Sequence, residues 1–305
     1  MTGPQPREDG LWQRARAIFA PVAGDVPACD VALLGVPGHL TSLSPTRADA
    51  TPAAVRDALR RYSTWSTAHG VDVATLTACD LGDVPAPDGP DGETRVAQAV
   101  GRAREAGLLI ALGGDNSITY AVARERVRDL STAGLITVDI HHDLRDGASN
   151  GSPVRRLIEA GLPGDRVAQI GIADFSNSPA YAQRARDLGI TVVPLQDVLE
   201  GDLGSIVTGA LDVAGSGGGA IHVDIDVDVC DRSVAPACPA SAPGGLSAAQ
   251  LRRLAFLLAR DPRVTSLDIT EIDATADAPD GRTVRLAALL VLEAMAGYRT
   301  RTVPE

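Results

Sequence analysis

The feature that most constrains the fold is a regular alternation of short apolar runs with longer segments of helical periodicity. Parallel strands connected by crossover helices produce this alternation. The runs are apolar at successive positions, as expected for strands that helices cover on both faces. We therefore predict an α/β fold of three layers, α/β/α, with a central eight-stranded parallel sheet. The strands are expected at residues 31–37, 73–80, 107–112, 134–140, 167–173, 189–195, 220–226 and 264–270.

Nothing in the middle of the chain resembles a linker, so residues 1–305 are expected to form a single domain. Aromatic residues make up only 3% of the chain, and the core must be built from Ala, Val, Leu and Ile. The first 14 residues lack the basic-then-apolar profile of a secretion signal, and no stretch is apolar enough to span a bilayer. We expect a cytoplasmic protein that makes no contact with a membrane.

The net charge of the chain limits the kinds of partner that it can bind. The formal net charge is −11, which disfavours nucleic acid and is compatible with divalent cations and a small-molecule substrate. The sequence contains no lysine, and this excludes Schiff-base chemistry on a lysine side chain. The four cysteines form no CxxC pair and are expected to be free thiols.

Two of the expected strands end in acidic residues. The fourth runs into DIHHDLRD, with Asp139, His141 and Asp143 at alternate positions, and the seventh runs into HVDIDVDVCD. Alternate side chains at a strand end point to the same side, and ligands of α/β sheets bind at the carboxyl ends of the strands. Clustered carboxylates repel one another unless a cation lies between them. A set of oxygen ligands with one or two imidazoles suits Mn²⁺ better than Zn²⁺.

A third loop at the same edge, LGGDNS (residues 112–117), follows the third expected strand. Its glycines are expected to let the backbone turn tightly into the next helix. The segments GGDNS, DIHHD and DIDVDVCDRSVAPACPASAPGGLS resemble, in this order, blocks of the ureohydrolase family, which includes arginase, agmatinase and formimidoylglutamase. The blocks TRADATPAAVRDAL, DLGDV and SLDITEID agree with this resemblance, which spans nearly the whole chain. It implies an arginase-like fold with a dinuclear manganese centre.

The resemblance also implies a set of metal ligands. The proline and glycine positions of the third block align Asp226 and Asp228 with the family's ligand pair and leave Asp224 outside it. One ion would be held by Asp139, His141, Asp226 and Asp228. The other would be held by Asp139, Asp143, Asp226 and Asn116.

The activity implied is hydrolysis of a C–N bond in an amidine by a manganese-activated hydroxide. Glu271 matches the family's substrate-orienting glutamate, and Asp143 and His142 are the other catalytic candidates. His142 points away from His141 if the strand persists, or can donate a proton if the strand has already ended.

Two positions depart from the family pattern. Asn116 stands where the family commonly has a metal-binding histidine, and an amide oxygen is a poorer donor to a transition ion than imidazole. One Mn²⁺ ion is therefore expected, and a second if Asn116 or a water completes its site. Asn150 stands where arginases and agmatinases have a histidine that shuttles protons.

The motifs DLR and FSNS, and the polar residue before GSP, resemble the formimidoylglutamase branch. The substrate would then be N-formimidoyl-L-glutamate, an intermediate of histidine degradation, whose two carboxylates suit arginines at the rim. The substrate-binding candidates are Arg145, Asn150, Ser152, Arg155, Arg232 and His39. An agmatinase-type hydrolase that releases urea and a catalytically weak binding scaffold remain alternatives. The family resemblance suggests a homo-oligomer, either a trimer or a hexamer.

Overall fold

The structure is a computed structural model that describes residues 9–24 and 26–301. Most of the segment in which we expect no secretion signal lies outside the described residues. No helix in the described part of the chain is long and apolar enough to cross a membrane.

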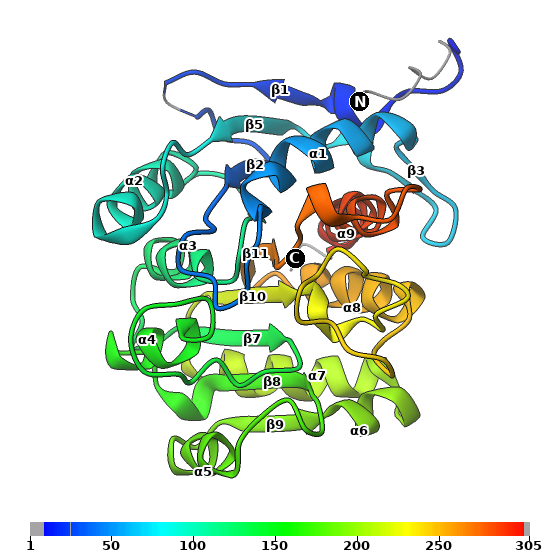
Figure 1. Ribbon diagram of the computed structural model, residues 1–305. Helices are drawn as coiled ribbons and strands as arrows, with labels where there is room; N and C mark the ends of the chain where they lie inside the picture. Colours follow the sequence, from blue (N-terminus) through cyan, green and yellow to red (C-terminus); the bar gives the residue numbers. More distant parts are fainter. Residues whose placement is uncertain (1–8, 25, 302–305) are drawn as a thin grey trace.

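A nine-stranded sheet forms the middle layer, with the strand order β1-β5-β2-β6-β11-β10-β7-β8-β9 (Figure 1). All neighbouring strands in it are parallel. The strands are β1 (Phe19–Pro21), β2 (Val31–Val36), β5 (Ala78–Asp83), β6 (Leu108–Gly113), β7 (Gly134–Val138), β8 (Val167–Ile172), β9 (Thr191–Pro194), β10 (Ile221–Asp226) and β11 (Val264–Thr270). A separate antiparallel pair joins β3 (Trp65–Ser66) to β4 (Val71–Asp72).

Two details of the predicted sheet were wrong. The sheet has nine strands because Phe19–Pro21 adds an edge strand beside β5, and a run of three residues is too short to stand out in the sequence. The strand expected at 73–80 begins only at Ala78, because Val73–Thr75 forms a 3₁₀ turn. The side chain of Asp72 caps that turn by accepting a hydrogen bond from the backbone N–H of Ala74 at 3.0 Å.

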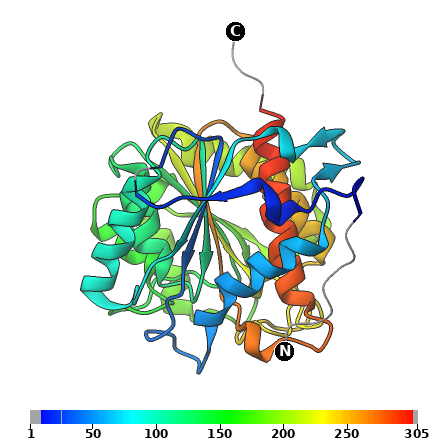
Figure 2. The ribbon, with the colours of Figure 1, turned by 90° about the horizontal axis from the view of Figure 1, so that it is seen from above.

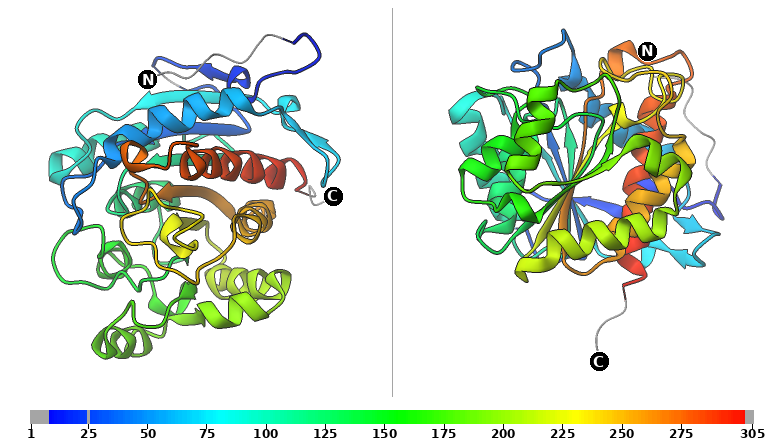
Figure 3. Two further views of the ribbon diagram at one scale, coloured as in Figure 1. Left: turned by 45° about the vertical axis from the view of Figure 1, so that its right-hand side comes forward. Right: turned by 90° about the horizontal axis from the view of Figure 1, so that it is seen from below.

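Helices cover both faces of the sheet, and Figure 2 shows the three layers edge-on. On one face α1, α9, α8 and α7 pack side by side, and on the other α2, α3 and α4 do so (Figure 3). The predicted α/β/α architecture is therefore confirmed. The helices are α1 (Thr51–Ala58), α2 (Gly89–Arg102), α3 (Ile118–Val127), α4 (Pro153–Glu159), α5 (Pro179–Asp187), α6 (Leu195–Glu200), α7 (Leu203–Ala214), α8 (Ala248–Arg260) and α9 (Arg282–Arg299).

The two faces of the central strands differ in polarity. Val223 and Ile225 of β10 belong to a large apolar core with residues of α7, α8 and α9. Alternation along the strand sends His222 and Asp224 to the opposite face, beneath α3. On that face, two smaller apolar clusters centre on the strand pairs β2–β6 and β7–β8. The strands between them, β10 and β11, thus carry a buried polar layer that leads to the carboxyl edge of the sheet.

Candidate metal centre

The predicted ligands meet at the carboxyl edge of four adjacent strands. Asn116 follows β6, Asp139 follows β7, and Asp226 is the last residue of β10. These strands, with β11 between β6 and β10, lie next to one another in the sheet. Segments that are more than 100 residues apart in sequence are therefore brought to one place by strand order alone.

One group of possible ligands consists of Asp139, His141 and Asp228, whose ligand atoms lie within 4.8 Å of one another. The Nδ1 atom of His141 lies 2.8 Å from Asp228 Oδ2 and 3.4 Å from Asp139 Oδ1. Both carboxylates are buried, whereas the imidazole is partly exposed. This group contains three of the four ligands expected for the first metal ion.

A second group consists of Asp139, Asp143 and Asp224, again with ligand atoms within 4.8 Å. Asp139 belongs to both groups, as a bridging ligand would. Asp226 is in neither, although its buried carboxylate lies beside both and its Oδ1 accepts the backbone N–H of Asp228 at 2.8 Å. The expectation that Asp226 bridges the two ions stays a prediction.

The electrostatics of the cluster fit a cation. Burial and the neighbouring carboxylates raise the pKa values of Asp139 and Asp226 well above the usual range. Burial also raises the pKa of Asp143 to about 7. Asp139 Oδ2 is buried and accepts no hydrogen bond from the described residues. Metal ions would supply the positive charge that these acids lack, and the donor set of carboxylates with one imidazole fits Mn²⁺.

Asn116 is buried and faces the second group through its nitrogen. Its Nδ2 donates to Asp143 Oδ2 at 2.6 Å and lies 3.4 Å from Asp224 Oδ2. Its Oδ1 accepts from the hydroxyls of Thr119 at 2.8 Å and Thr270 at 3.2 Å. Asn116 would have to rotate its amide by about half a turn to offer oxygen to a metal ion.

Glu271 lies at the end of β11 beside the cluster. Its Oε1 accepts the backbone N–H of Asn116 at 2.8 Å and Nδ2 of Asn150 at 2.9 Å. Burial, together with the charge of Asp115, raises its pKa to about 8. Glu271 and Asp143 both have positive φ angles, 63° and 52°, a strained conformation that is concentrated at functional sites.

A sequence model of the arginase family matches residues 29–297 of this chain. The chain belongs to the arginase family. A formimidoylglutamase from Halalkalibacterium halodurans is 35% identical over 281 residues, which cover 89% of this chain and 88% of the relative. The mitochondrial agmatinase of Gallus gallus is more distant, with 28% identity over 90% of this chain and 82% of its own.

Solved structures agree with this assignment. The crystal structure of formimidoylglutamase from Bacillus subtilis has a TM-score of 0.91 and 30% identity, covering 99% of this chain and 97% of its own. A formiminoglutamase from Trypanosoma cruzi, crystallised with Mn²⁺, has a TM-score of 0.86 and 24% identity, covering 95% and 100% of the two chains. The arginase-family fold of the chain is thus supported by sequence and by structure.

Of the three rim arginines expected in this arginase-family chain, Arg145 and Arg232 are exposed and Arg155 is partly buried. The guanidinium of Arg155 donates to the carbonyls of Arg145 and Gly147, and so holds the 145–151 loop. Arg232 donates to the carbonyl of Cys238 at 2.5 Å. Both guanidinium groups already donate to backbone carbonyls. A role for Arg155 or Arg232 in substrate binding stays a prediction.

The remaining candidates line the loops around the cluster. Ser152 is buried and its hydroxyl donates to the carbonyl of Ser149 at 2.8 Å. The Nδ1 atom of His39 lies 3.8 Å from Oδ2 of Asp88. His142 is buried, and its Nδ1 lies 2.7 Å from Gln169 Oε1, so the side chain points away from the metal ligands. In this structure the imidazole forms a hydrogen bond with Gln169, and a proton-donating role for His142 stays a prediction.

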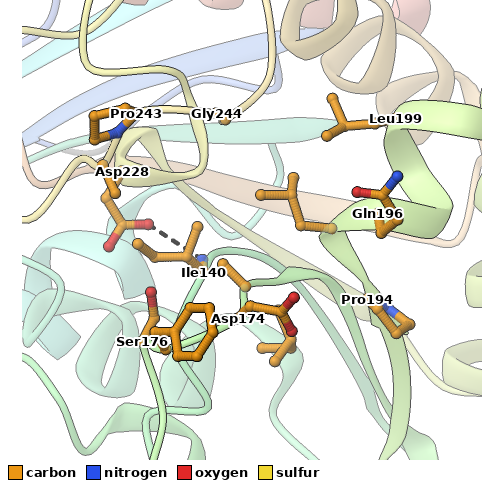
Figure 4. Close-up of a pocket in the computed structure, with 15 residues that line it drawn as sticks. Ile140, Asp174, Ser176, Pro194, Gln196, Leu199, Asp228, Pro243 and Gly244 are labelled. Carbon is orange, nitrogen blue, oxygen red and sulfur yellow. Dashed lines mark hydrogen bonds between the residues drawn. The ribbon is translucent and has the colours of Figure 1, made fainter.

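A cavity of about 250 Å³ lies against the cluster on the side of β8 and β9 (Figure 4). Asp228 reaches it and accepts the backbone N–H of Ile140 at 3.2 Å. The charged residues in its lining are Asp174 and Asp228. This lining therefore offers no side chain of opposite charge to a dicarboxylate.

The structure places Asp224 in a group of possible ligands that the sequence analysis did not include it in. The alternation of HVDID already places this residue on the same face as Asp226, but the family alignment left it outside the ligand pair. Asp268 was also missed. It lies opposite Asp224 in the register of β10 and β11, as part of the buried polar layer.

Proposed function

We propose that this protein is a manganese-dependent formimidoylglutamase, which hydrolyses N-formimidoyl-L-glutamate to L-glutamate and formamide. The observation that carries the proposal is the pair of ligand groups that share Asp139, with Glu271 buried beside them. Relatives named formimidoylglutamase at 33–35% identity support the choice of substrate.

The ligands of the first ion would be Asp139, His141, Asp226 and Asp228. The ligands of the second would be Asp139, Asp143, Asp226 and, once its amide has turned its oxygen to the ion, Asn116. When bound, such ions supply an activated water as the nucleophile and stabilise negative charge that develops during attack on the amidine carbon.

The chain's own residues would orient the substrate. Glu271 is fixed by two donors on Oε1, which leaves Oε2 to accept N–H groups of the planar formimino group. Addition of water then gives a tetrahedral carbon, and cleavage of its bond to the glutamate nitrogen releases formamide. The departing nitrogen takes a proton and leaves as the amine of glutamate. Asn150 donates to Glu271 through Nδ2, so the proposed role of Asn150 is to position the carboxylate of Glu271.

The direct test compares two substrates with the Mn²⁺-loaded protein. We expect glutamate and formamide in equal amounts from N-formimidoyl-L-glutamate, and no urea from agmatine. Urea from agmatine without formamide from the formimino compound would overturn the choice of substrate. Turnover of neither compound by protein with full metal content would favour the scaffold interpretation.

A variant tests the orienting carboxylate. Glu271→Gln keeps the shape of the side chain but removes its charge, and we expect kcat/KM to fall about 100-fold at unchanged Mn²⁺ content. The matched control is Glu293→Gln on α9, where Glu293 pairs with Arg252 at 2.6 Å. Equal activities of the two variants would remove Glu271 from the mechanism.

We also expect a trimer or hexamer in solution, which light scattering can measure.

A further inference from the structure

Arg145 is an exposed arginine next to the metal centre, and its guanidinium is not paired with an acid. It lies two residues after the proposed ligand Asp143, and two residues of chain span at most about 7 Å. No acidic side chain in the described part of the chain forms an ion pair with Arg145, whereas the nearby Arg184 pairs with Asp146 at 2.8 Å. The guanidinium of Arg145 therefore keeps its N–H groups for a carboxylate from outside the protein.

One side chain of α5 holds the backbone on both sides of Arg145. Nη1 of Arg184 donates to the carbonyl of Leu144 at 2.6 Å and to Oδ1 of Asp146 at 2.8 Å. The ion pair with Asp146 is exposed and contributes little by itself. The charged hydrogen bond to the backbone of the buried Leu144 is the stronger restraint. Arg184 thus fixes the backbone from which the side chain of Arg145 extends.

The side chain of Arg145 is restrained by Gly151 and by a tyrosine of α5. A Cβ atom at Gly151 would lie 2.6 Å from Cδ of Arg145, so the glycine leaves room for this side chain. The guanidinium carbon of Arg145 lies 5.8 Å from the centre of the Tyr181 ring, and that of Arg184 lies 5.7 Å from the same centre. The ring packs against the apolar cluster below it. Contact with a fixed aromatic ring orients a guanidinium without using its N–H groups.

The start of α5 is itself fixed to the segment that carries metal ligands. Asn177, just before the helix, accepts the backbone N–H of His142 at 3.0 Å and donates to the carbonyl of Ile140 at 2.8 Å. These two residues flank a proposed metal ligand. Ser178 then caps the helix by accepting the backbone N–H of Tyr181 at 3.2 Å. Helix α5 therefore sets the place of Arg145 relative to the metal centre.

We propose that Tyr181 and Arg184 are positioning residues, which hold Arg145 where it binds a carboxylate of the substrate. This inference rests on the proposed function, because it takes the substrate to be a formimino dicarboxylate that reacts at the metal centre. Arg145 contacts the substrate, and the two residues of α5 act through it. The carboxylate does not change during the reaction, so the loss of this contact should raise KM and leave kcat unchanged.

The test measures formamide release by the Mn²⁺-loaded protein over a range of N-formimidoyl-L-glutamate concentrations. For Arg184→Gln and for Tyr181→Leu we expect KM to rise about tenfold, with kcat within about twofold of the parent value. Tyr181→Phe keeps the ring and should keep the parent KM. An unchanged KM in Arg184→Gln, a tenfold rise in Tyr181→Phe, or a loss that falls on kcat would each overturn the proposal.

A double variant separates positioning from a general effect on the structure. Arg145→Gln should raise KM about 100-fold, because it removes a bidentate charged contact. If Arg184 acts through Arg145, adding Arg184→Gln to this variant should change KM no further. A further tenfold rise would show an independent effect and contradict the proposal.

The matched control is Arg124→Gln on α3. The guanidinium carbon of Arg124 lies 5.7 Å from the ring centre of Tyr120 in its own helix, so the control loses the same kind of contact at the same distance. It should keep the parent KM. A rise equal to that of Arg184→Gln would show that the effect is not specific to α5.

Binding of L-glutamate, the expected product, needs no turnover and can be measured by calorimetry. We expect Arg184→Gln to bind it about tenfold more weakly than the parent chain. A parent-like affinity in this variant would contradict the positioning role even if the parent hydrolyses the formimino compound. A weaker affinity would support the role even if the parent hydrolyses none. A parent chain that neither hydrolyses the formimino compound nor binds L-glutamate would contradict both proposals.

Discussion

Gly114 is the position where one added methyl group should do most damage to the metal centre. A Cβ atom there would lie 2.1 Å from the carbonyl oxygen of Gly38 and 2.5 Å from its nitrogen. Both are backbone atoms, which cannot rotate away as a side chain can. The φ angle of Gly114 is not positive, so the requirement for glycine comes from the close approach of two loops and not from a left-handed turn.

The size of the effect can be worked from these contacts. The loops must separate by about 0.9 Å for the Cβ atom to reach even the 3.0 Å limit of real contacts. The hydrogen bond from the N–H of Asp115 to the carbonyl of Gly38, now 2.8 Å, would then be too long to count. Its loss, together with overpacking, should lower the free energy of unfolding by about 2–4 kcal/mol. That corresponds to a fall in Tm of roughly 4–8 °C.

The same shift should reach the carboxylate of Glu271, which we propose orients the substrate. The carbonyl of Gly114 accepts the N–H of Glu271 at 2.9 Å, and the N–H of Asn116 donates to Glu271 Oε1. We expect kcat of Gly114→Ala to fall at least about tenfold, since misplacement by 1 Å can cost about 100-fold in rate. The assays are thermal denaturation and formamide release.

Gly113→Ala is the matched control, one residue earlier, at the end of β6. Its Cβ atom would meet Ile269 O and Thr270 Cγ2 at 3.0 Å, which small adjustments can relieve. We expect it to be clearly less affected in both assays. Parent-like Tm and kcat in Gly114→Ala, or equal losses in the two variants, would refute the reasoning.

Two further predictions concern protons and a remote ion pair. Burial lowers the pKa of His141, but the charge of Asp228 and the hydrogen bond to it outweigh burial and raise the pKa to about 9. The imidazole must lose its proton to bind metal, so Mn²⁺ affinity should rise at least about tenfold from pH 6.5 to 8.5 in calorimetry, and a flat profile would contradict this. Far from the site, buried Asp80 pairs with Arg16 and Arg56, both at 3.0 Å. Asp80→Ala should lower the free energy of unfolding, measured in urea, by about 2 kcal/mol. This loss is smaller than for an isolated buried pair because Arg56 keeps its ion pair with Asp83. An unchanged urea midpoint would show that the ion pairs of Asp80 add nothing to stability.

The sequence was sufficient for the architecture because strands buried on both faces and amphipathic helices have distinct periods. It was sufficient for the location of the site because parallel strands bring their carboxyl ends to one edge. It failed at β1, where three residues carry no period, and at residues 73–77, where Asp72 closes a turn inside an apolar run.

Side-chain roles were harder to predict than positions. Arg155 and Arg232 lie near the site in sequence, yet each guanidinium binds backbone carbonyls of its own loop. Such contacts depend on the path of the loop, which has no periodic signal. Asp224 was visible as part of an alternating run, but only the structure shows it beside Asp139 and Asp143.

The buried polar layer explains why metal and fold should be coupled in this protein. The chain has 28 basic residues, but in the described part none of its arginines contacts the carboxylates of Asp139, Asp143 or Asp224. Side chains thus leave most of the charge uncompensated, and the unmet cost of burying it opposes folding of this edge of the sheet. Divalent ions would remove that cost, so occupancy of the site should stabilise the folded state as well as activate water. The amide of Asn116 is neutral and adds no charge to the cluster, whereas the buried acid Asp224 adds to the negative charge that cations would offset.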